Sequence, residues 1–481
     1  MNFGMIRSFL GRVLQIVGTM MLLPALVALI YREFNGVYFV ACGALMFMFG
    51  MLLANIRHPK EGRFYAREGF VITALSWLFL SLGGCLPLWL SGEIPSFTDA
   101  FFETVSGFTT TGASIVPAVE DLSHCMNFWR CFIQLIGGMG VLVFLLALLP
   151  STGGQDLYLM KAESPGPSVG KIAPKVRQTA YYLYAIYFAL TGALIICLWI
   201  SGMPFFDSVC TAFATTSTGG FGVRNTSLGA YGPATQYVTA IFLFFAGLNY
   251  NFFFLIWTKR FREALRSEEI RLYTLIFWLS TACITASLFL RGGMGGEESF
   301  RHAFFQVSSI MTTAGFSSTD FAPWPALCRE ILILLMLIGG CAGSTCGGIK
   351  VSRILIYLKS LKKELSQLCH PHIVKILKVE GKALPHTVLR SANIFLITYG
   401  FIFTVSLLLI SIDGCDFTTN FTAVASALGN IGPGFSLVGP TQNFAFFSPF
   451  AKYVLIFDML AGRLELFPML VLISPETWRK K

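Results

Sequence analysis

Long apolar runs separated by short polar links extend along the whole chain. Ten of these runs, each of about twenty residues, are long enough to cross the hydrocarbon core of a bilayer as helices. They lie near residues 10–30, 37–56, 69–91, 128–149, 179–201, 236–257, 272–291, 329–350, 389–411 and 449–473. The pattern predicts an all-α integral membrane protein with about ten transmembrane helices.

The first apolar run follows Arg7 and Arg12 and could be taken for a signal peptide, with Ala25 and Ala28 as weak cleavage-site candidates. It is longer than the apolar region of a typical signal peptide, and a second spanning run follows almost at once. We therefore expect a retained helix.

Four short segments, rich in Thr or Ser or containing Asn, end in glycine between the apolar runs. These filter segments read TTTG (Thr109 to Gly112), TSTG (Thr216 to Gly219), TTAG (Thr312 to Gly315) and GNIG (Gly429 to Gly432). Four re-entrant hairpins in one chain can surround an axis with backbone carbonyls, as the filters of ion channels do. The repetition therefore predicts a cation pore.

The similarity continues upstream of the four glycines, although the second repeat departs from it. Three repeats share Phe97, Phe300 and Phe417, then Phe101, Phe304 and Phe421, then Ser106, Ser309 and Ser426; the second repeat has Pro204, Ser208 and Phe213 there. Aromatic residues four apart share a helix face. Each filter segment is therefore expected to follow a short half-helix.

Glycine is expected where a filter strand turns its carbonyls toward the axis, because a Cβ atom penalises such backbone angles. Oxygen rings replace part of the hydration shell of a monovalent cation, and a filter without carboxylates disfavours strong divalent binding. Four loops with purely structural roles are the alternative. Irregular backbone at membrane depth is tolerated only inside protein or around water, which disfavours that alternative.

Composition and charge placement refine the class of protein. Apolar residues make up 55% of the chain and charged residues 12%, with a mean hydropathy of +0.68, which excludes an ordinary soluble domain. Fourteen of the fifteen lysines lie in links on one side of the ten-helix arrangement, Lys452 being the exception. By the positive-inside rule, that side and both termini are cytoplasmic and the filter segments face outside. The net charge of +10 then reflects orientation and lipid contact, not nucleic acid.

Acidic residues gather in the links on the filter side. They are Glu93, Asp99, Glu103, Glu120, Asp121, Asp207, Glu297, Glu298, Asp320, Asp413 and Asp416. They form either an acidic vestibule that concentrates cations or ordinary solvated loop surface, and the sequence leaves both open.

Enzyme motifs are missing from the sequence. No H-E-x-x-H, Walker A or G-x-G-x-x-G pattern occurs, and GPSVGK (Gly166 to Lys171) is one residue short of Walker A and lacks its Ser or Thr. We expect no enzyme, no catalytic residue and no cofactor. Cys369, His370 and His372 could bind a metal but are more often exposed surface in a basic loop. A disulfide on the filter side stays open for Cys125, Cys131, Cys328 and Cys415.

The apolar run near residues 329–350 ends in GGCAGSTCGGIK (Gly339 to Lys350). Each of its glycines costs a helix about 1 kcal/mol relative to alanine, so we expect the helix to break. Close helix packing through small residues is the alternative, although the polar Ser344 and Thr345 interrupt it.

The last apolar run places a charged residue near mid-membrane in DMLAGRLELFP (Asp458 to Pro468). An unpaired arginine there costs about 2.5–3.5 kcal/mol on insertion scales. Asp458 and Glu465 do not have a favourable same-face spacing to Arg463. We therefore expect Arg463 to face water or a partner other than these two carboxylates.

With these segments in view, the whole chain resembles the Trk/Ktr/HKT superfamily of potassium transporters, and within it the bacterial TrkH type. The resemblance implies four helix, pore-loop, helix repeats around a central pore plus two N-terminal helices. It implies a potassium-binding filter of Thr110, Thr111, Gly112, Ser217, Thr218, Gly219, Thr313, Ala314, Gly315, Asn430, Ile431 and Gly432. It also implies gating roles for Gly339, Gly340, Gly343, Ser344, Thr345, Gly347, Gly348 and Lys350, which we name the gating loop, and for Arg463 as an electrostatic barrier.

The expected division of the chain follows the same resemblance. Residues 1–60 hold two N-terminal helices, and the pore repeats occupy 61–155, 156–265, 266–384 and 385–481. The expected activity is gated potassium uptake across the bacterial inner membrane, driven mainly by membrane potential, with coupled symport of potassium with protons or sodium as the alternative. A scaffold protein with a dead pore is a third class.

The resemblance also implies partners. They are a second copy in a homodimer and a cytosolic RCK-type regulator similar to TrkA, which would bind NAD or ATP. Basic links at Lys161 to Arg177, Lys259 to Arg271 and Lys359 to Lys382 are candidate docking surfaces for it, or contacts for lipid head groups.

Overall fold

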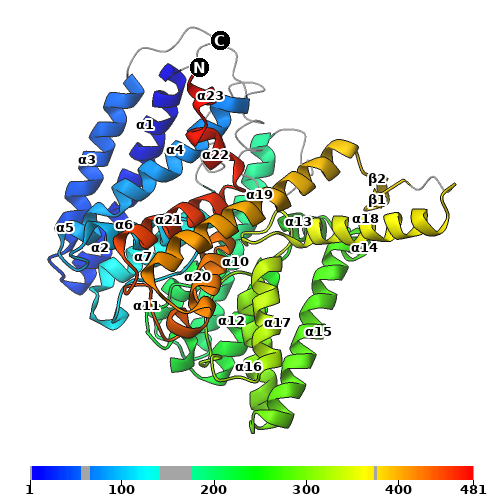
Figure 1. Ribbon diagram of the computed structural model, residues 1–481. Coiled ribbons are helices and arrows are strands. Elements are labelled where there is room, and N and C mark those ends of the chain that lie inside the picture. Colours follow the sequence, from blue (N-terminus) through cyan, green and yellow to red (C-terminus); the bar gives the residue numbers. More distant parts are fainter. Residues whose placement is uncertain (1–2, 56–65, 141–175, 373–375, 480–481) are drawn as a thin grey trace.

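The described residues of the computed structural model, 3–55, 66–140, 176–372 and 376–479, form an almost entirely helical protein (Figure 1). The N-terminal part contains α1 (Phe3–Met20), α2 (Leu22–Tyr31) and α3 (Gly36–Asn55). The first repeat region contains α4 (Ala66–Gly84), α5 (Leu86–Leu90), α6 (Phe97–Phe108) and α7 (His124–Gly138), and the second α10 (Val176–Ile200), α11 (Phe205–Thr216), α12 (Pro233–Ala246), α13 (Tyr250–Trp257) and α14 (Phe261–Arg266).

The second half of the chain has the same character. Its helices are α15 (Glu268–Arg291), α16 (Gly296–Met311), α17 (Ala326–Ile338), α18 (Val351–Cys369), α19 (His386–Ile410), α20 (Phe417–Gly429), α21 (Pro449–Arg463), α22 (Phe467–Ile473) and α23 (Pro475–Trp478). Four single 3-10 turns lie at 119–121, 227–230, 411–413 and 436–438. In the described part of the chain the only sheet is a hairpin of β1 (Lys378–Val379) and β2 (Lys382–Ala383).

Helices occupy all ten predicted apolar runs, and the predicted fold class is confirmed. Six spans, Phe3–Tyr31, Gly36–Ala54, Arg67–Leu90, Ala180–Ile200, Glu268–Arg291 and His386–Asp413, are long and apolar enough to cross a membrane. A seventh is α12 with α13, which bend by 92° at their junction. The shorter helices α7, α17 and α21 occupy the other three runs, and the end of the run near 128–149 lies outside the described residues.

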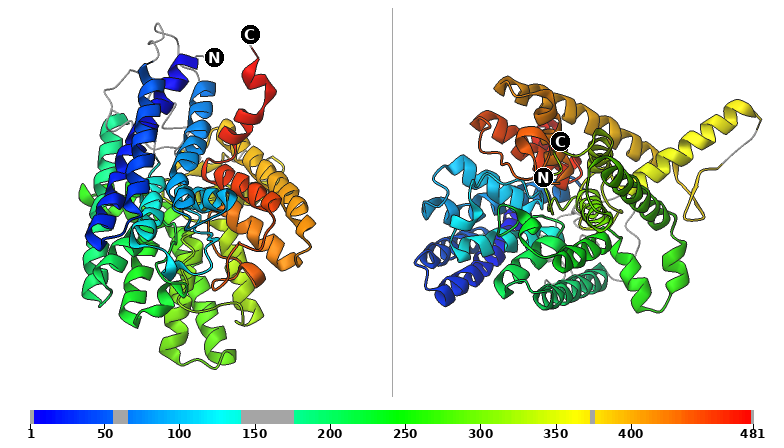
Figure 2. Two further views of the ribbon diagram at one scale, coloured as in Figure 1. Left: turned by 90° about the vertical axis from the view of Figure 1, so that its left-hand side faces the viewer. Right: turned by 90° about the horizontal axis from the view of Figure 1, so that it is seen from below.

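The helices repeat in a fixed order. A helix (α4, α10, α15 or α19) precedes a short pore helix (α6, α11, α16 or α20), and a filter segment and a further helix (α7, α12, α17 or α21) follow. Viewed from below in Figure 2, these groups succeed one another around a centre, in the colour order of the sequence. The expected repeat limits near residues 60 and 155 lie outside the described residues.

The N-terminal helices lie beside this arrangement and pack closely on one another. Helix α1 packs along α3 and against α4. A Cβ atom on Gly11 would lie 2.5 Å from the carbonyl oxygen of Gly50, and one on Gly18 would lie 2.6 Å from that of Gly43. These glycines let the two backbones approach as small residues do in membrane helix pairs.

The first and last helices end at the same side of the molecule (Figure 1). The ring of Phe3 in α1 stacks on that of Trp478 in α23, with centroids 6.5 Å apart. Large apolar side chains such as Leu29, Ile200, Leu290 and Ile397 are exposed. Such side chains suit contact with lipid tails, because a multi-pass membrane protein presents apolar helix faces to the bilayer.

Candidate functional site: a ring of four re-entrant segments

All four pore helices end in the same unusual backbone conformation. Four residues that follow the last turns of these helices have positive φ. They are Thr110, Thr218, Thr313 and Asn430, with values of 54°, 55°, 58° and 53°. Non-glycine residues seldom occupy this region, and then as single residues held by their surroundings. The recurrence identifies these four residues as structural equivalents.

Hydrogen bonds fix the same register. The backbone N–H groups of Thr111, Gly219, Ala314 and Ile431 donate to the carbonyls of Ser106, Ala214, Ser309 and Ser426, at 2.9, 2.7, 2.8 and 3.0 Å. The following residue is in each case a glycine with positive φ: Gly112, Gly220, Gly315 and Gly432, at 80°, 77°, 80° and 104°.

The second repeat therefore differs from the sequence alignment by one residue. The equivalent of Gly112 is Gly220, not Gly219, and the equivalent stretch is Thr218 to Gly220 in place of Ser217 to Gly219. The sequence offers two adjacent glycines here, and the alignment took the first. Counting from Gly220 places Phe205 fifteen residues upstream, matching the phenylalanines of the other repeats. That agreement was the available signal.

The four segments form a closed ring. A Cβ atom on Gly112 would lie 2.1 Å from the carbonyl oxygen of Gly219, and one on Gly220 would lie 1.7 Å from that of Ala314. A Cβ on Gly315 would lie 1.9 Å from the oxygen of Ile431, and one on Gly432 would lie 2.9 Å from that of Thr111. Each repeat thus meets the next, and the fourth meets the first. The predicted convergence of the filter segments is present, with Gly220 in the second position.

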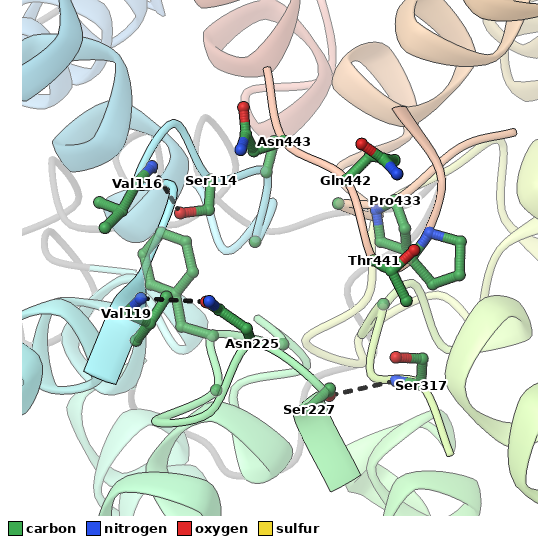
Figure 3. Close-up of a pocket in the computed structure, with 18 of the residues that line it drawn as sticks. Ser114, Val116, Val119, Asn225, Ser227, Ser317, Pro433, Thr441, Gln442 and Asn443 are labelled. Carbon is green, nitrogen blue, oxygen red and sulfur yellow. Dashed lines mark hydrogen bonds between the residues drawn. The ribbon is translucent and has the colours of Figure 1, made fainter. Parts of the chain in front are cut away.

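A cavity opens beyond this ring, and all four glycines line it. Figure 3 shows polar side chains around it, including those of Ser114, Asn225, Ser317, Gln442 and Asn443. Hydrogen bonds join the repeats at this mouth. They run from Val119 N to Asn225 Oδ1 at 3.0 Å, from Leu228 N to Ser317 O at 2.9 Å and from Phe444 N to Ser114 O at 2.9 Å.

An acidic vestibule is absent from the wall of this cavity. Among the described residues that line it there is no Asp or Glu, whereas Arg130 and Arg224 are present. Glu103, expected in the acidic loops, is fully buried in α6, and Asp99 pairs with Lys452 at 2.7 Å. Of the two alternatives that the sequence left open, the acidic vestibule is not found among the described residues of this wall.

Glu103 instead anchors the backbone that leaves the first filter segment. Its carboxylate accepts from Ile115 N at 2.8 Å and from Ser114 Oγ at 3.0 Å, and it pairs with Arg130 of α7 at 2.6 Å. The Arg130 guanidinium lies 4.3 Å from the ring centre of Phe221, in the second repeat. Sequence reasoning missed this pair, because the two side chains are 27 residues apart on different helices.

Other side chains support the ring from behind. Gln134 of α7 donates to the carbonyl of Gly219 at 2.7 Å and accepts from Phe221 N at 3.1 Å. Ser309 donates to the carbonyl of Phe316 at 2.6 Å, and Ser426 to that of Gly432 at 2.5 Å. Widening the ring would break these hydrogen bonds and leave buried polar groups without partners, which costs free energy. The contacts therefore limit how far the ring can widen.

The gating loop interrupts the helix as predicted. Helix α17 ends at Ile338, and α18 begins at Val351. Thr345 Oγ1 donates to the carbonyl of Thr216 at 3.3 Å and accepts from Thr218 Oγ1 at 3.2 Å. Gly347 N donates to Thr313 Oγ1 at 2.7 Å, and a Cβ atom on Gly347 would lie 2.1 Å from the carbonyl of Gly429. The loop therefore packs directly against three of the four filter segments.

Arg463, at the end of α21, fastens this loop to the opposite repeat. Its guanidinium donates to the carbonyl of Thr345 at 2.7 Å and to those of Gly137 and Gly138 at 2.5 and 2.6 Å. The two nearby carboxylates have other partners: Glu465 pairs with Arg353, and Asp458 accepts from Ser406 at 2.7 Å. Lys350, the last residue of the gating loop, is buried and donates to the carbonyl of Cys346.

The candidate metal ligands and the candidate disulfide cysteines were the other open possibilities in the sequence. Cys369, His370 and His372 are exposed at the end of α18. In the described ranges no group of three or more potential ligands could hold a metal ion. All twelve cysteines lie in these ranges and are free thiols, so the four on the filter side form no disulfide.

The fold and the ring define a multi-pass membrane transport protein in which four repeats of one chain surround a common centre. The chain belongs to the TrkH family, described as cation transport proteins, whose profile matches residues 36–480. The family consists of cation transporters, not enzymes.

Several named relatives resemble the chain over its length. The Trk system potassium uptake protein TrkH of Escherichia coli is 38% identical over all of both chains. The Trk system potassium uptake protein TrkG of Escherichia coli is 33% identical over 95% of each. The crystal structure of the potassium transporter TrkH from Vibrio parahaemolyticus superposes with a TM-score of 0.89, at 35% identity and complete coverage of both chains.

Proposed function

We propose that the chain takes up potassium across the cell membrane through a gated pore whose selectivity filter is the four-segment ring. The closed succession of Gly112, Gly220, Gly315 and Gly432 carries this proposal. It brings backbone oxygens from all four repeats into one ring that a partly dehydrated monovalent cation can enter. The names of the relatives, potassium uptake proteins, support potassium as the ion.

The filter residues of this proposal follow the structural register. They are Thr110, Thr111, Gly112, Thr218, Gly219, Gly220, Thr313, Ala314, Gly315, Asn430, Ile431 and Gly432. Carbonyl rings without carboxylates suit a monovalent ion better than Ca²⁺ or Mg²⁺, which prefer charged oxygen ligands. The wall of the mouth above the ring is polar and contains no Asp or Glu among its described residues, which agrees with this choice.

The gating loop and Arg463 form the closed gate in this proposal. The loop lies against three filter segments, and Arg463 places a positive charge between it and α7. A cation leaving the filter meets both a steric block and a repulsive charge. Opening requires two changes. The loop must move away from Thr313, and the carbonyl of Thr345 must lose its hydrogen bond with Arg463.

Membrane potential is the proposed driving force. It supplies about 2.3 kcal/mol per charge per 100 mV, enough for roughly fiftyfold accumulation of a monovalent cation. The orientation that fits uptake has both termini in the cytoplasm of a bacterial inner membrane and the filter mouth outside. The lysine distribution supports it.

A homodimer and a cytosolic RCK-type regulator resembling TrkA, which would bind NAD or ATP, complete the proposal. Each chain contains a complete ring, so a second copy is not needed to build the pathway. The basic links at Lys259 to Arg271 and Lys359 to Lys382 are candidates for the regulator, and Lys259, Arg260 and Lys382 are exposed there. Most of the third candidate link, Lys161 to Arg177, lies outside the described residues.

Reconstitution in liposomes with bi-ionic reversal potentials, with and without the regulator, tests the proposal. A gated potassium pore gives a reversal potential set by potassium alone, and currents that depend on the regulator. A reversal potential that shifts with pH or sodium in a fixed ratio would instead indicate coupled symport. Absence of uptake in a potassium-transport-deficient cell would indicate a dead pore.

A further inference from the structure

One carboxylate outside the pore reaches into the gating loop. Glu269, in the first turn of α15, accepts a hydrogen bond from the backbone N–H of Ala342 at 2.6 Å. Ala342 is buried within the loop, and the two residues are 73 positions apart. A buried amide that loses its acceptor bears the desolvation cost of the unpaired group, so this contact stabilises the loop in its observed position.

The loop around Ala342 is held at successive backbone positions. Cys341 N donates to the carbonyl of Gly247 at 3.0 Å, and the carbonyl of Gly343 accepts from Tyr250 N at 3.1 Å. Both partners belong to the bend between α12 and α13. Glu269 adds a side-chain contact from α15 between these two backbone contacts. The first half of the loop is therefore fixed from the second and third repeats together.

The end of α15 that carries Glu269 is itself capped from outside the helix. Glu380 Oε1 accepts from Ser267 Oγ at 2.8 Å, from Glu268 N at 2.9 Å and from Glu269 N at 3.3 Å. The first N–H groups of a helix lack intrahelical partners, and a carboxylate there also suits the helix dipole. Glu380 thus fixes the turn from which the Glu269 side chain extends.

Glu380 sits at the tip of the small hairpin between α18 and α19. Lys378 pairs with Ala383 and Val379 with Lys382, and the turn residues Glu380 and Gly381 both have positive φ, 53° and 72°. Two positive φ values in succession match the tight turn that suits a two-residue hairpin. The hairpin is exposed, as is Glu380 itself.

A second residue of α15 holds the hairpin in return. Glu268 Oε2 accepts from Glu380 N at 2.8 Å and from Lys359 Nζ of α18 at 2.5 Å. Lys359 Nζ also donates to the carbonyl of Lys378 at 2.8 Å. The hairpin, the start of α15 and the middle of α18 therefore form one connected hydrogen-bonded unit, and Glu269 links that unit to the loop.

We propose that Glu269 is a positioning residue that holds the gating loop closed, and that the Glu380 hairpin sets the strength of this hold. Displacement of Glu380 from α15 would loosen the turn carrying Glu269 and so free Ala342. This inference rests on the proposed gating role of the loop. It names the route by which an event at the exposed hairpin reaches the pore.

Ion flux through purified, reconstituted full-length protein without any regulator tests this hold. Glu269→Ala removes the acceptor and is expected to raise rubidium flux severalfold without changing the rubidium-to-sodium ratio. Glu269→Gln keeps a carbonyl oxygen for Ala342 N and should stay near the wild-type flux. Glu380→Ala should raise flux in the same direction but less. Glu476→Ala, at an exposed carboxylate in α23, is the matched control and should change nothing.

Arg463→Ala separates failure of this inference from failure of the gate itself. If Arg463→Ala raises flux whereas Glu269→Ala and Glu380→Ala do not, the loop is a gate and the hold by Glu269 is refuted. If none of the three raises flux, the gating role also fails. If Glu269 only supported the fold, Glu269→Ala and Glu269→Gln would both lower the flux, and by the same amount. Should Glu269→Ala not fold, the exposed Glu380→Ala decides the matter, and unchanged flux there overturns the proposal.

Discussion

The filter ring repeats one backbone conformation four times, whereas the gating loop beneath it is one long segment of the third repeat. In the ring, the four residues Thr110, Thr218, Thr313 and Asn430 have φ values within a few degrees of one another, and each segment contacts the next. The helices after the second and fourth filter segments are interrupted only over residues 247–249 and 464–466, whereas the loop extends from the end of α17 at Ile338 to the start of α18 at Val351. Its contacts come from α12–α13, α15 and α21 and from the filter itself.

This difference teaches how one chain combines a fixed part with a movable part. A closed ring resists change because moving one segment disturbs both neighbours, and side chains such as Gln134 support it from behind. The loop is a single copy of glycine-rich chain held by separate hydrogen bonds. Removing one of those contacts weakens the loop without affecting the ring, and low local stability is typical of elements that move.

The largest expected effect distinguishes the two glycines of the second segment. In Gly220→Ala the new Cβ would lie 1.7 Å from the carbonyl of Ala314, at a φ of 77°, so potassium flux should fall by an order of magnitude or more, a barrier increase of at least about 1.4 kcal/mol. In Gly219→Ala the Cβ meets the Gln134 side chain, which can shift, so the loss should be smaller.

Rubidium uptake in liposomes measures both variants, with Gly192→Ala in α10 as the control, because no atom lies within 4 Å of a Cβ there. A greater loss for Gly219→Ala than for Gly220→Ala would restore the register of the sequence alignment.

The second prediction concerns the stability of the ring. Glu103→Gln removes one charge of a fully buried ion pair, and an uncompensated buried charge costs about 3–5 kcal/mol. A clear drop in the thermal unfolding temperature of the purified protein is expected. Glu263→Ala breaks an exposed pair worth at most about 1 kcal/mol and should leave the temperature nearly unchanged. Equal shifts in the two variants would contradict the anchoring role of Glu103.

The third prediction concerns the gate. Arg463→Ala removes the positive charge and three hydrogen bonds that fasten Thr345 to α7. Conductance and regulator-free flux should rise on the order of tenfold, because each 1.4 kcal/mol removed from a barrier is a factor of about ten. Arg463→Lys keeps the charge but not the planar arrangement of donors. Its flux should therefore lie between those of the wild type and Arg463→Ala. Single-channel conductance unchanged in Arg463→Ala would rule out the barrier role.

The smallest expected effect lies at the end of α20 that is remote from the ring, where Asp416 caps the helix. The hydrogen bond from the Thr419 hydroxyl holds the pKa of Asp416 below its ordinary value of 3.8, so the charged cap is fully present at neutral pH. Asp416→Ala should cost about 1 kcal/mol at pH 7. The difference from wild type should shrink as the pH falls from the ordinary value of 3.8 through the lowered pKa, because over that range the unfolded chain binds a proton that the folded state does not.

Thermal unfolding at neutral and acidic pH measures this difference. Ser96→Ala removes the corresponding cap of α6, where Asp99 N donates to Ser96 Oγ at 3.4 Å, and serves as a pH-independent comparison. A difference that grows on acidification would contradict the cap.

The sequence by itself determined the class of protein and the parts of the site. Apolar runs must become helices in a bilayer, because only helices and closed barrels satisfy their backbone there. The Thr and Gly segments, the glycine-rich break after Ile338 and the mid-membrane Arg463 were all recognisable for local reasons.

Tertiary structure decided what depends on neighbours distant in the chain. Whether Gly219 or Gly220 closes the second segment depends on the carbonyl of Ala314 in another repeat, and local sequence cannot weigh that contact. In the sequence, Glu103 is one of several carboxylates near the filter side. Only the packing of α7 against α6 places Arg130 beside it. Likewise, the contacts of Glu269 with Ala342 and of Arg463 with Gly137 follow from how whole helices pack, since hydrogen bonds between distant segments leave no periodic trace in the sequence.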